Sequence, residues 1–471
     1  MDSSQIRLFY RNATAEAIGE EHGITHDQLE RIAAETVPMI RRVNEQRKAG
    51  ETPYRDLPYQ THVVERIHDI VGEVHGRCKN LVVLGIGGSA LGNIALQTAL
   101  NPFMYNLDDK QRRGPRLFVL DNIDPEQFGS FLRWIRNELD QTIFNVISKS
   151  GRTIETAAQF GIVCDMLIKE LGQHSLRDQL VATTDPKEGI LREIADRLNL
   201  RSLDVPDGVG GRFSVLSAVG LFSAAMCGIN VDRLLAGAQD MDTRVKREDF
   251  YENPAAVNAA LNYHFWNHGK RTSVMMPYSY HLKDLADWYR QLWAESLGKA
   301  RDSLNREVHV GPTPIRALGA TDQHSQIQLY REGPNDKLFT FLQVTVFEQD
   351  IPIKVPPDLP TELAYLTDRN LGELLNSEKR ATEFALVSSR RPCLTVVFPR
   401  VDAYAVGQFI YLFEVTTSLV GALLNINAYD QPAVELGKEA TFALLGKPGK
   451  DYAELDREIR GLTELDEHFL V

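Results

Sequence analysis

The fold is decided by residues 81–89, which read Leu81-Val82-Val83-Leu84-Gly85-Ile86-Gly87-Gly88-Ser89. The run 81–84 is apolar and has the length of a short strand, and residues 90–100 form an apolar stretch of helical length. A strand, a glycine turn and a helix start present free backbone N–H groups and the positive end of a helix dipole. Gly87 and Gly88 allow close approach of a ligand, and Ser89 adds a hydroxyl. The stretch therefore predicts an anion site at the end of a strand.

The same glycine turn also fits a dinucleotide-binding loop. Gly85, Gly87 and Ala90 match the loose Gly-x-Gly-x-x-Gly/Ala pattern, and Asp121 ends the next expected strand, residues 117–120. Asp121 comes later than the ribose-binding acid of such proteins should. From this loop alone, a phosphate ligand and a dinucleotide are about equally favoured.

A second strand-loop-helix unit begins with the expected strand 142–147. Its loop reads Ser148-Lys149-Ser150-Gly151-Arg152-Thr153, and a helix is expected from Glu155 to Leu171. Three hydroxyls, a lysine and the N–H groups of a helix start can surround a phosphate monoester. The loop lacks the Gly-x-x-x-x-Gly-Lys-Ser/Thr pattern, which favours a phosphorylated metabolite over a nucleoside triphosphate. The alternative is a simple capped loop, because Ser and Thr are common at helix N-caps.

Strands and helices alternate from residue 81 to residue 205, which predicts a parallel sheet wrapped by helices. Ligands of such sheets bind at the carboxyl ends of the strands, where both loops lie. A second alternating unit has expected strands at 273–276, 338–347 and 394–398, and expected helices at 362–387 and 404–424. We therefore expect an α/β protein with a helical N-terminal extension (1–60), two α/β domains (61–230 and 255–428) and a C-terminal helical segment (429–471).

The strongest candidate for the chemistry is the expected helix 288–299. Gln291 and Glu295 are four residues apart, so they share a helix face and lie roughly 6 Å apart along its axis. An amide that holds a ligand and a carboxylate that accepts a proton could grip two ends of one small sugar. The alternative is a solvated helix face, which is the usual place for a lone glutamate.

Three further side chains are candidates for the same site. Arg212 follows Gly210 and Gly211 at the start of an apolar helix, where a guanidinium could stabilise an oxyanion. His324 lies between a loop and a helical run, and histidine is the usual acid–base group near neutral pH. Lys438 lies in a helix that follows Pro432, and it could reach the site if that helix packs back on it.

A metal site is not expected. His264 and His268 have the i, i+4 spacing of two ligands on a helix, but the glutamate of His-Glu-x-x-His is missing and no third ligand is evident. The four cysteines are scattered and form no Cys-x-x-Cys, so neither a disulfide framework nor a zinc knuckle is indicated.

The net charge and the apolar pattern of the chain argue against several classes of function. The chain has 471 residues and a formal charge of −12, which argues against a general binder of nucleic acid or of an anionic membrane. Its N-terminus lacks the basic and apolar regions of a signal peptide, and no apolar run is expected to reach transmembrane length. We therefore expect a cytoplasmic protein.

Taken together, six short motifs resemble the glucose-6-phosphate isomerase (phosphoglucose isomerase) family over about residues 81–445. In order, they are Gly-Ile-Gly-Gly-Ser, Ser-Lys-Ser-Gly-x-Thr-x-Glu-Thr, Gly-Gly-Arg-Phe-Ser, Gln-x-x-x-Glu-Ser-x-Gly-Lys, Gln-His-Ser and Gln-Pro-Ala-Val-Glu-x-Gly-Lys. Ala433 stands where the family commonly has glycine, which changes the backbone near Lys438 more than the chemistry. The chain is also shorter than the longest family members, which leaves surface loops and additional roles open.

The resemblance implies two sugar-isomerase (SIS) domains and the interconversion of glucose 6-phosphate and fructose 6-phosphate in glycolysis and gluconeogenesis. It implies that Glu295 moves a proton between C1 and C2 through a cis-enediolate, and that Arg212 stabilises the intermediate. It implies that His324 and Lys438 serve ring opening. The substrate-binding residues that it implies are Gly88, Ser89, Ser148, Lys149, Ser150, Thr153, Gln291 and Gln431. It further implies a homodimer in which His324 enters the neighbouring subunit's site, without a metal or organic cofactor.

Isomerisation next to a carbonyl fits this set of residues. The reaction needs a base over two adjacent carbons, a stabiliser for an enediolate oxygen and a separate acid–base pair for the ring. Binding of a remote phosphate supplies the positioning energy. Three alternatives remain: a phosphosugar sensor without turnover, a nicotinamide dehydrogenase built on residues 85–90, and an isomerase that also accepts mannose 6-phosphate.

Overall fold

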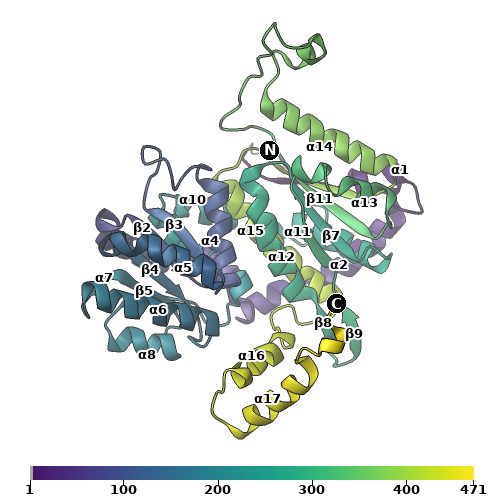
Figure 1. The fold of residues 1–471 in the computed structure, drawn as a ribbon. Helices are drawn as coiled ribbons and strands as arrows, with labels where there is room; N and C mark the ends of the chain where they lie inside the picture. Colours follow the sequence, from purple (N-terminus) through teal and green to yellow (C-terminus); the bar gives the residue numbers. More distant parts are fainter. Residues whose placement is uncertain (1–3) are drawn as a thin grey trace. The chain divides into compact units, whose positions relative to one another are not determined.

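A computed structural model of the protein describes residues 4–471, which form a mixed α/β fold with largely parallel sheets flanked by helices (Figure 1). Contacts divide the chain into a large unit, Met1–Ala428, and a small unit, Tyr429–Val471. The large unit contains both five-stranded sheets.

The first sheet is entirely parallel, and its strands are β2 (Asn80–Leu84), β3 (Arg116–Leu120), β4 (Thr142–Ile147), β5 (Leu180–Thr184) and β6 (Arg201–Asp204). Every residue of β2, β4 and β5 is buried, as expected for strands that are covered on both faces. The helices of this part of the chain are α3 (Thr61–Val74), α4 (Gly88–Leu100), α5 (Pro125–Ile135), α6 (Ile154–Leu171), α7 (Ser175–Gln179), α8 (Ile190–Arg197) and α9 (Ala218–Met226). The predicted alternation of strands and helices from residue 81 to residue 205 is confirmed.

The direction in which strands are added to this sheet reverses between β2 and β4. The order is β3-β2-β4-β5-β6, so the chain leaves β2 toward one edge and then crosses to the other side of β2. Loops that follow the two strands on either side of such a reversal diverge and leave a crevice. The glycine turn after β2 and the Ser148–Thr153 loop after β4 follow the two strands on either side of this reversal.

The second sheet is mixed, which corrects the expectation of a purely parallel one. Its order is β1-β12-β11-β7-β10, with parallel strands β7 (Thr272–Pro277), β10 (Thr313–Arg316), β11 (Lys337–Val344) and β12 (Cys393–Phe398). The edge strand β1 (Arg7–Phe9) pairs antiparallel with β12. The expected helical N-terminal extension, residues 1–60, did not include this strand, because a three-residue strand is too short to show a period of two.

The remaining helices of the large unit are α1 (Ala15–Ile18), α2 (His26–Lys48), α10 (Val231–Val245), α11 (Pro254–Asn267), α12 (Lys283–Leu297), α13 (Ile327–Glu332), α14 (Leu371–Ser388) and α15 (Ala403–Leu423). A short hairpin, β8 (Lys299–Arg301) with β9 (Glu307–Val310), follows α12. The expected helix 362–387 is wrong at its start. A separate 3₁₀ turn forms at Thr361–Leu366, and Asp368, with φ of 65°, interrupts the chain before α14 begins.

Helix α15 corrects a further expectation, that no apolar run reaches transmembrane length. It is 21 residues long and apolar enough to cross a membrane by length and composition. However, 89% of its most apolar window is buried inside the fold, where it packs against α10 and α11. A helix that is apolar on all sides is typical of the centre of a large protein, and α15 fills that place.

A buried polar cluster ties the N-terminal segment to the centre of the large unit. The carboxylate of Asp242 on α10 accepts hydrogen bonds from Arg47 (2.8 Å), Arg55 (3.1 Å), Tyr59 (2.8 Å) and Tyr411 (2.6 Å). Burial alone would raise the pKa of Asp242, but the hydrogen bonds and cationic partners outweigh burial and lower the pKa to about 2. The cluster therefore holds a buried charge that is fully paired.

The small unit consists of α16 (Ala433–Leu444) and α17 (Lys450–Thr463), followed by a 3₁₀ turn at Glu467–Phe469. Gly446 and Gly449, both with positive φ, make the turn that lets the two helices pack against each other. The expected helical character of the segment that begins at residue 429 is confirmed.

Candidate active site

The glycine turn after β2 packs directly against the segment that carries Arg212. Gly87 has φ of 59°, and Gly88 is the first residue of α4. A Cβ atom on Gly88 would lie 2.2 Å from the backbone of Gly211, so no larger residue fits there without moving one of the loops. Gly88 is therefore required by the contact between two loops, and this contact brings Ser89 and Arg212 into one neighbourhood.

The loop after β4 gathers its hydroxyl groups. The buried Ser148 Oγ accepts the N–H of Gly151 (3.1 Å) and lies 3.3 Å from Thr153 Oγ1, and Ser150 Oγ accepts the N–H of Arg152 (3.2 Å). Thr153 is the N-cap residue of α6, yet its side chain makes no capping hydrogen bond. This geometry disfavours the simple capped loop, because the hydroxyl of Thr153 is not used to cap the helix.

Lys149 gives this loop a positive charge. Its Nζ donates to the carbonyl of Pro206 at 3.3 Å, in the segment that leads from β6 to Arg212. The nearby Asp185 has a lowered pKa, first because its carboxylate accepts the backbone N–H of Lys187 and also because of the charge of Lys149. The second loop is thus linked to the segment that precedes Arg212.

Arg212 is buried and held on three sides. Its Nε donates to Ser296 Oγ at 2.7 Å, its Nη2 donates to the carbonyl of Ala428 at 2.7 Å, and its Nη1 lies 3.2 Å from Glu295 Oε1. The side chain of Arg212 is 1% exposed and that of Glu295 is 26% exposed. A fixed guanidinium therefore lies beside a carboxylate that solvent or a ligand can reach.

Gln291 and Glu295 share one face of α12, as their spacing predicts. Gln291 Nε2 donates to Glu295 Oε2 at 3.0 Å, and a Cβ atom on Gly87 would lie 3.1 Å from the same Nε2. Gln291 Oε1 is buried and has no hydrogen-bond donor among residues 4–471. An unsatisfied buried acceptor is rare in native proteins, and this one lies on the residue that contacts the partly exposed carboxylate of Glu295.

His324 lies in a different environment from the residues above. It is exposed, at the end of the 3₁₀ turn Thr321–Gln323, and its imidazole makes no hydrogen bond to any other residue of the described chain. Asp322 orders this loop, because its carboxylate accepts the N–H of Leu318 (2.7 Å) and the hydroxyl of Ser325 (2.7 Å). The loop therefore presents His324 outward from the large unit.

Gln431 and Lys438 belong to the small unit. Gln431 is partly buried just before α16, and Lys438 on α16 is exposed and forms an ion pair with Glu435 at 2.7 Å. Contacts within the large unit link Gly88 to Gly211, Gly87 to Gln291, Gln291 to Glu295 and Glu295 to Arg212. The hydroxyl loop Ser148–Thr153 lies at the adjacent strand end.

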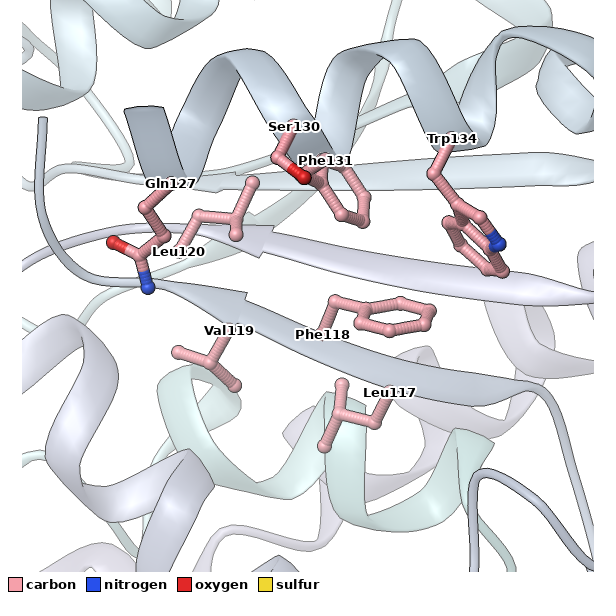
Figure 2. Close-up of a pocket in the computed structure, with 8 residues that line it drawn as sticks. All are labelled: Leu117, Phe118, Val119, Leu120, Gln127, Ser130, Phe131 and Trp134. Carbon is pink, nitrogen blue, oxygen red and sulfur yellow. The ribbon is translucent and has the colours of Figure 1, made fainter. Parts of the chain in front are cut away.

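The pocket drawn in Figure 2 is not a competing site for the chemistry. It lies between β3 and α5 and is lined by Leu117, Phe118, Val119, Leu120, Gln127, Ser130, Phe131 and Trp134. None of these side chains can act as an acid or a base near neutral pH, so the pocket cannot supply proton transfer.

His264 and His268 also remain outside this cluster. They stack with ring centroids 4.0 Å apart at the C-terminal end of α11, and burial lowers the pKa of His264 to about 4. No group of three or more potential metal ligands occurs among residues 4–471.

The arrangement is suited to moving a proton next to a stabilised oxyanion. It combines a reachable carboxylate, a fixed guanidinium and an adjacent loop of hydroxyls with one lysine. Ser296 was not anticipated as a partner of Arg212, although it lies in the motif that contains Glu295. Its place directly after Glu295 in that motif was the available signal.

Comparisons with known proteins agree with one another. Residues 60–461 match the model of the phosphoglucose isomerase family. A glucose-6-phosphate isomerase from Carboxydothermus hydrogenoformans is 48% identical over 411 residues, which cover 86% of this chain and 88% of that protein. One from Rubrobacter xylanophilus is 40% identical over 448 residues, which cover 95% of this chain and 99% of that protein.

Solved structures share the fold. A hypothetical protein from Thermus thermophilus has a TM-score of 0.84 at 34% identity, with 94% of this chain and 100% of that one covered. A glucose-6-phosphate isomerase from Chlamydia trachomatis has a TM-score of 0.73 at 24% identity, with 85% of this chain and 77% of that one covered. The fold of most of this chain has thus been observed in crystal structures of other proteins.

Proposed function

The chain belongs to the phosphoglucose isomerase family and interconverts glucose 6-phosphate and fructose 6-phosphate, and from this premise we propose how its side chains perform the reaction. The observation that carries the proposal is the pairing of Glu295 with the buried Arg212 at 3.2 Å. Aldose–ketose isomerisation needs a base and an oxyanion stabiliser at this kind of separation, because the proton leaves a carbon next to the oxygen that becomes negative.

Glu295 acts as the base that moves a proton between C1 and C2. Removal of the proton turns the open-chain sugar into a cis-enediolate, whose negative oxygen Arg212 stabilises with an N–H group. Return of the proton to the neighbouring carbon completes the isomerisation. The unsatisfied Oε1 of Gln291 supports this placement, because it offers an acceptor to a sugar hydroxyl one helical turn from the carboxylate.

The phosphate binds at the Ser148–Thr153 loop. Ser148, Ser150 and Thr153 offer hydroxyl donors, Lys149 supplies positive charge, and α6 begins at Ile154 with its dipole directed at the loop. Gly88 and Ser89 line the sugar, and Gln431 contributes to binding. Binding energy from this remote phosphate holds C1 and C2 against Glu295.

Ring opening is assigned to His324 and Lys438. The family arrangement that we adopt has two SIS domains (61–230 and 255–428), an N-terminal extension (1–60) and a C-terminal segment (429–471) that carries Lys438. The protein acts as a cytoplasmic homodimer in glycolysis and gluconeogenesis, without a metal or organic cofactor. Exposure of His324 supports its entry into the site of the neighbouring subunit.

Proton NMR tests this function directly. Purified protein is incubated with fructose 6-phosphate in D₂O that contains EDTA. We expect glucose 6-phosphate with deuterium at C2, because a proton held by a partly exposed carboxylate exchanges with solvent. Absence of turnover, with broadening of the ligand signals on binding, would instead identify a phosphosugar sensor. A parallel titration with NAD and NADP is expected to show no binding.

Complementation between two inactive variants tests the shared site. Glu295→Gln and His324→Ala are co-expressed, so that about half of the dimers carry one subunit of each kind. If His324 acts in the neighbouring subunit, each mixed dimer keeps one intact site, and the mixture recovers about a quarter of the wild-type activity. Activity no higher than that of either variant alone would place His324 in the site of its own subunit.

A further inference from the structure

Ser296 has no role in the chemistry described so far, yet it contacts the most buried charged group of the site. It follows Glu295 directly on α12 and is completely buried. Its Oγ accepts the Nε–H of Arg212 at 2.7 Å, a short distance for a hydrogen bond to a neutral hydroxyl. A single turn of one helix thus supplies both the carboxylate and the partner of the guanidinium.

The contacts of Arg212 fix the plane of its guanidinium. Nε is held by Ser296 and Nη2 by the carbonyl of Ala428, each at 2.7 Å. A planar group whose Nε and Nη2 are both hydrogen-bonded cannot rotate without breaking one of these bonds. Nη1 is consequently directed toward Glu295 Oε1 at 3.2 Å.

The hydroxyl of Ser296 also prevents a competing arrangement. Without it, the buried Nε–H of Arg212 would lose this acceptor, and leaving a buried donor unpaired is costly. The carboxylate of Glu295 lies beside the guanidinium and could take the place of the lost acceptor. Rotation of the guanidinium toward this carboxylate would satisfy the donor, but it would tighten the ion pair on the base and move Nη1 away from the substrate.

We propose that Ser296 is a positioning residue, which holds the Arg212 guanidinium where negative charge develops on the enediolate and keeps Glu295 available as the base. This inference rests on the proposed function and adds a residue to it. Ser296 does not touch the substrate. Its hydroxyl acts through Arg212, so its contribution appears in the transition state and not in the binding of the sugar phosphate, whose C1–C2 end is uncharged before the proton leaves.

The test compares Ser296→Ala with Ser296→Thr, which keeps a hydroxyl at the same position. For Ser296→Ala we expect kcat to fall by about 10–100-fold with KM changed less than threefold, as for the loss of one hydrogen bond to a charged group. Ser296→Thr is expected to recover most of kcat. The matched control is Ser273→Ala on β7, which removes another buried hydroxyl that contacts α12, at Tyr289 Oη (2.7 Å), and is expected to leave kcat unchanged.

Two unreactive ligands distinguish positioning from general loosening of the fold. A five-carbon sugar acid phosphate carries a carboxylate in place of the enediolate, whereas a six-carbon polyol phosphate carries no charge there. Ser296→Ala is expected to weaken binding of the sugar acid at least tenfold more than binding of the polyol. Equal losses for both ligands, or a matching fall of kcat in Ser273→Ala, would overturn the inference.

A failure of the role proposed for Ser296 can be distinguished from a failure of the proposed function. If the wild-type protein does not isomerise fructose 6-phosphate, the proposed function fails. If the wild-type protein is active and Ser296→Ala retains its kcat and its preference for the sugar acid, only the role of Ser296 is refuted. If Ser296→Ala does not fold, Ser296→Thr becomes the test of the inference. A folded Ser296→Thr variant whose kcat is at least tenfold below that of Ser273→Ala would contradict the role of Ser296.

Discussion

Replacement of Glu295 by glutamine is expected to lower kcat by about 10²–10⁴-fold, the range that a general base contributes. Glutamine keeps the shape of the side chain and its contact with Gln291, but it cannot accept a proton from carbon. Arg212 loses its anionic partner, yet its bonds to Ser296 and Ala428 remain. The measurement is the initial rate of glucose 6-phosphate formation, with binding of an unreactive polyol phosphate followed by calorimetry.

The control for this change is Glu307→Gln on the β8–β9 hairpin, whose side chain is 68% exposed and pairs with His309 at the surface. We expect Glu307→Gln to leave the rate unchanged, because a surface pair of this kind contributes little. Loss of turnover together with retained polyol binding identifies Glu295 as the base. Turnover within tenfold of wild type in Glu295→Gln would remove Glu295 from that role.

Replacement of Asp242 by asparagine is expected to destabilise the protein by about 3–5 kcal/mol, the cost of breaking a buried ion pair by removal of one partner. Arg47, Arg55, Tyr59 and Tyr411 all donate to this carboxylate, so the change leaves several buried donors with a neutral amide. The measurement is urea unfolding at pH 7 followed by circular dichroism. The matched control is Asp232→Asn on the same helix, whose side chain is 73% exposed and is expected to change stability by less than about 0.5 kcal/mol.

The stability that Asp242 contributes should depend on pH in a defined direction. Its pKa is lowered from 3.8 to about 2 in the folded protein, so the unfolded chain binds this proton more readily. The contribution, about 2 kcal/mol, is therefore present above about pH 4 and is lost as pH falls through 2. The difference in unfolding free energy between wild type and Asp242→Asn should shrink between about pH 5 and pH 2. A difference that stays constant over this range would contradict the paired carboxylate.

Much of the fold could be predicted from local sequence signals. The buried strands of the first sheet, such as Leu81–Leu84, stand out because an entirely parallel sheet needs continuous apolar runs. Strand β1 could not be predicted, since Arg7, Leu8 and Phe9 carry no periodic signal and their pairing depends on a partner far away in the chain. The break at Asp368 was missed for a related reason, because one residue with positive φ leaves little trace in composition.

The candidate site was predictable where its residues lie next to glycine turns or share a helix face. Spacing alone predicted that Gln291 and Glu295 would meet, and the structure brings them to 3.0 Å. Spacing could not show that Arg212 reaches Ser296 and Ala428, because these residues come from three distant segments. The roles of His324 and Lys438 remain predictions, which the complementation experiment addresses for His324.

The pairing of β1 with β12 has a consequence for how the protein folds during its synthesis on the ribosome. All strands of the first sheet lie within residues 80–204, so this sheet can form as soon as that stretch has emerged. Arg7, in contrast, pairs with Val397, 390 residues later, and at ordinary rates of synthesis it waits about 20–80 s for its partner. During that time β12 has not yet been synthesised, so residues 7–9 leave the ribosome long before the strand with which they pair.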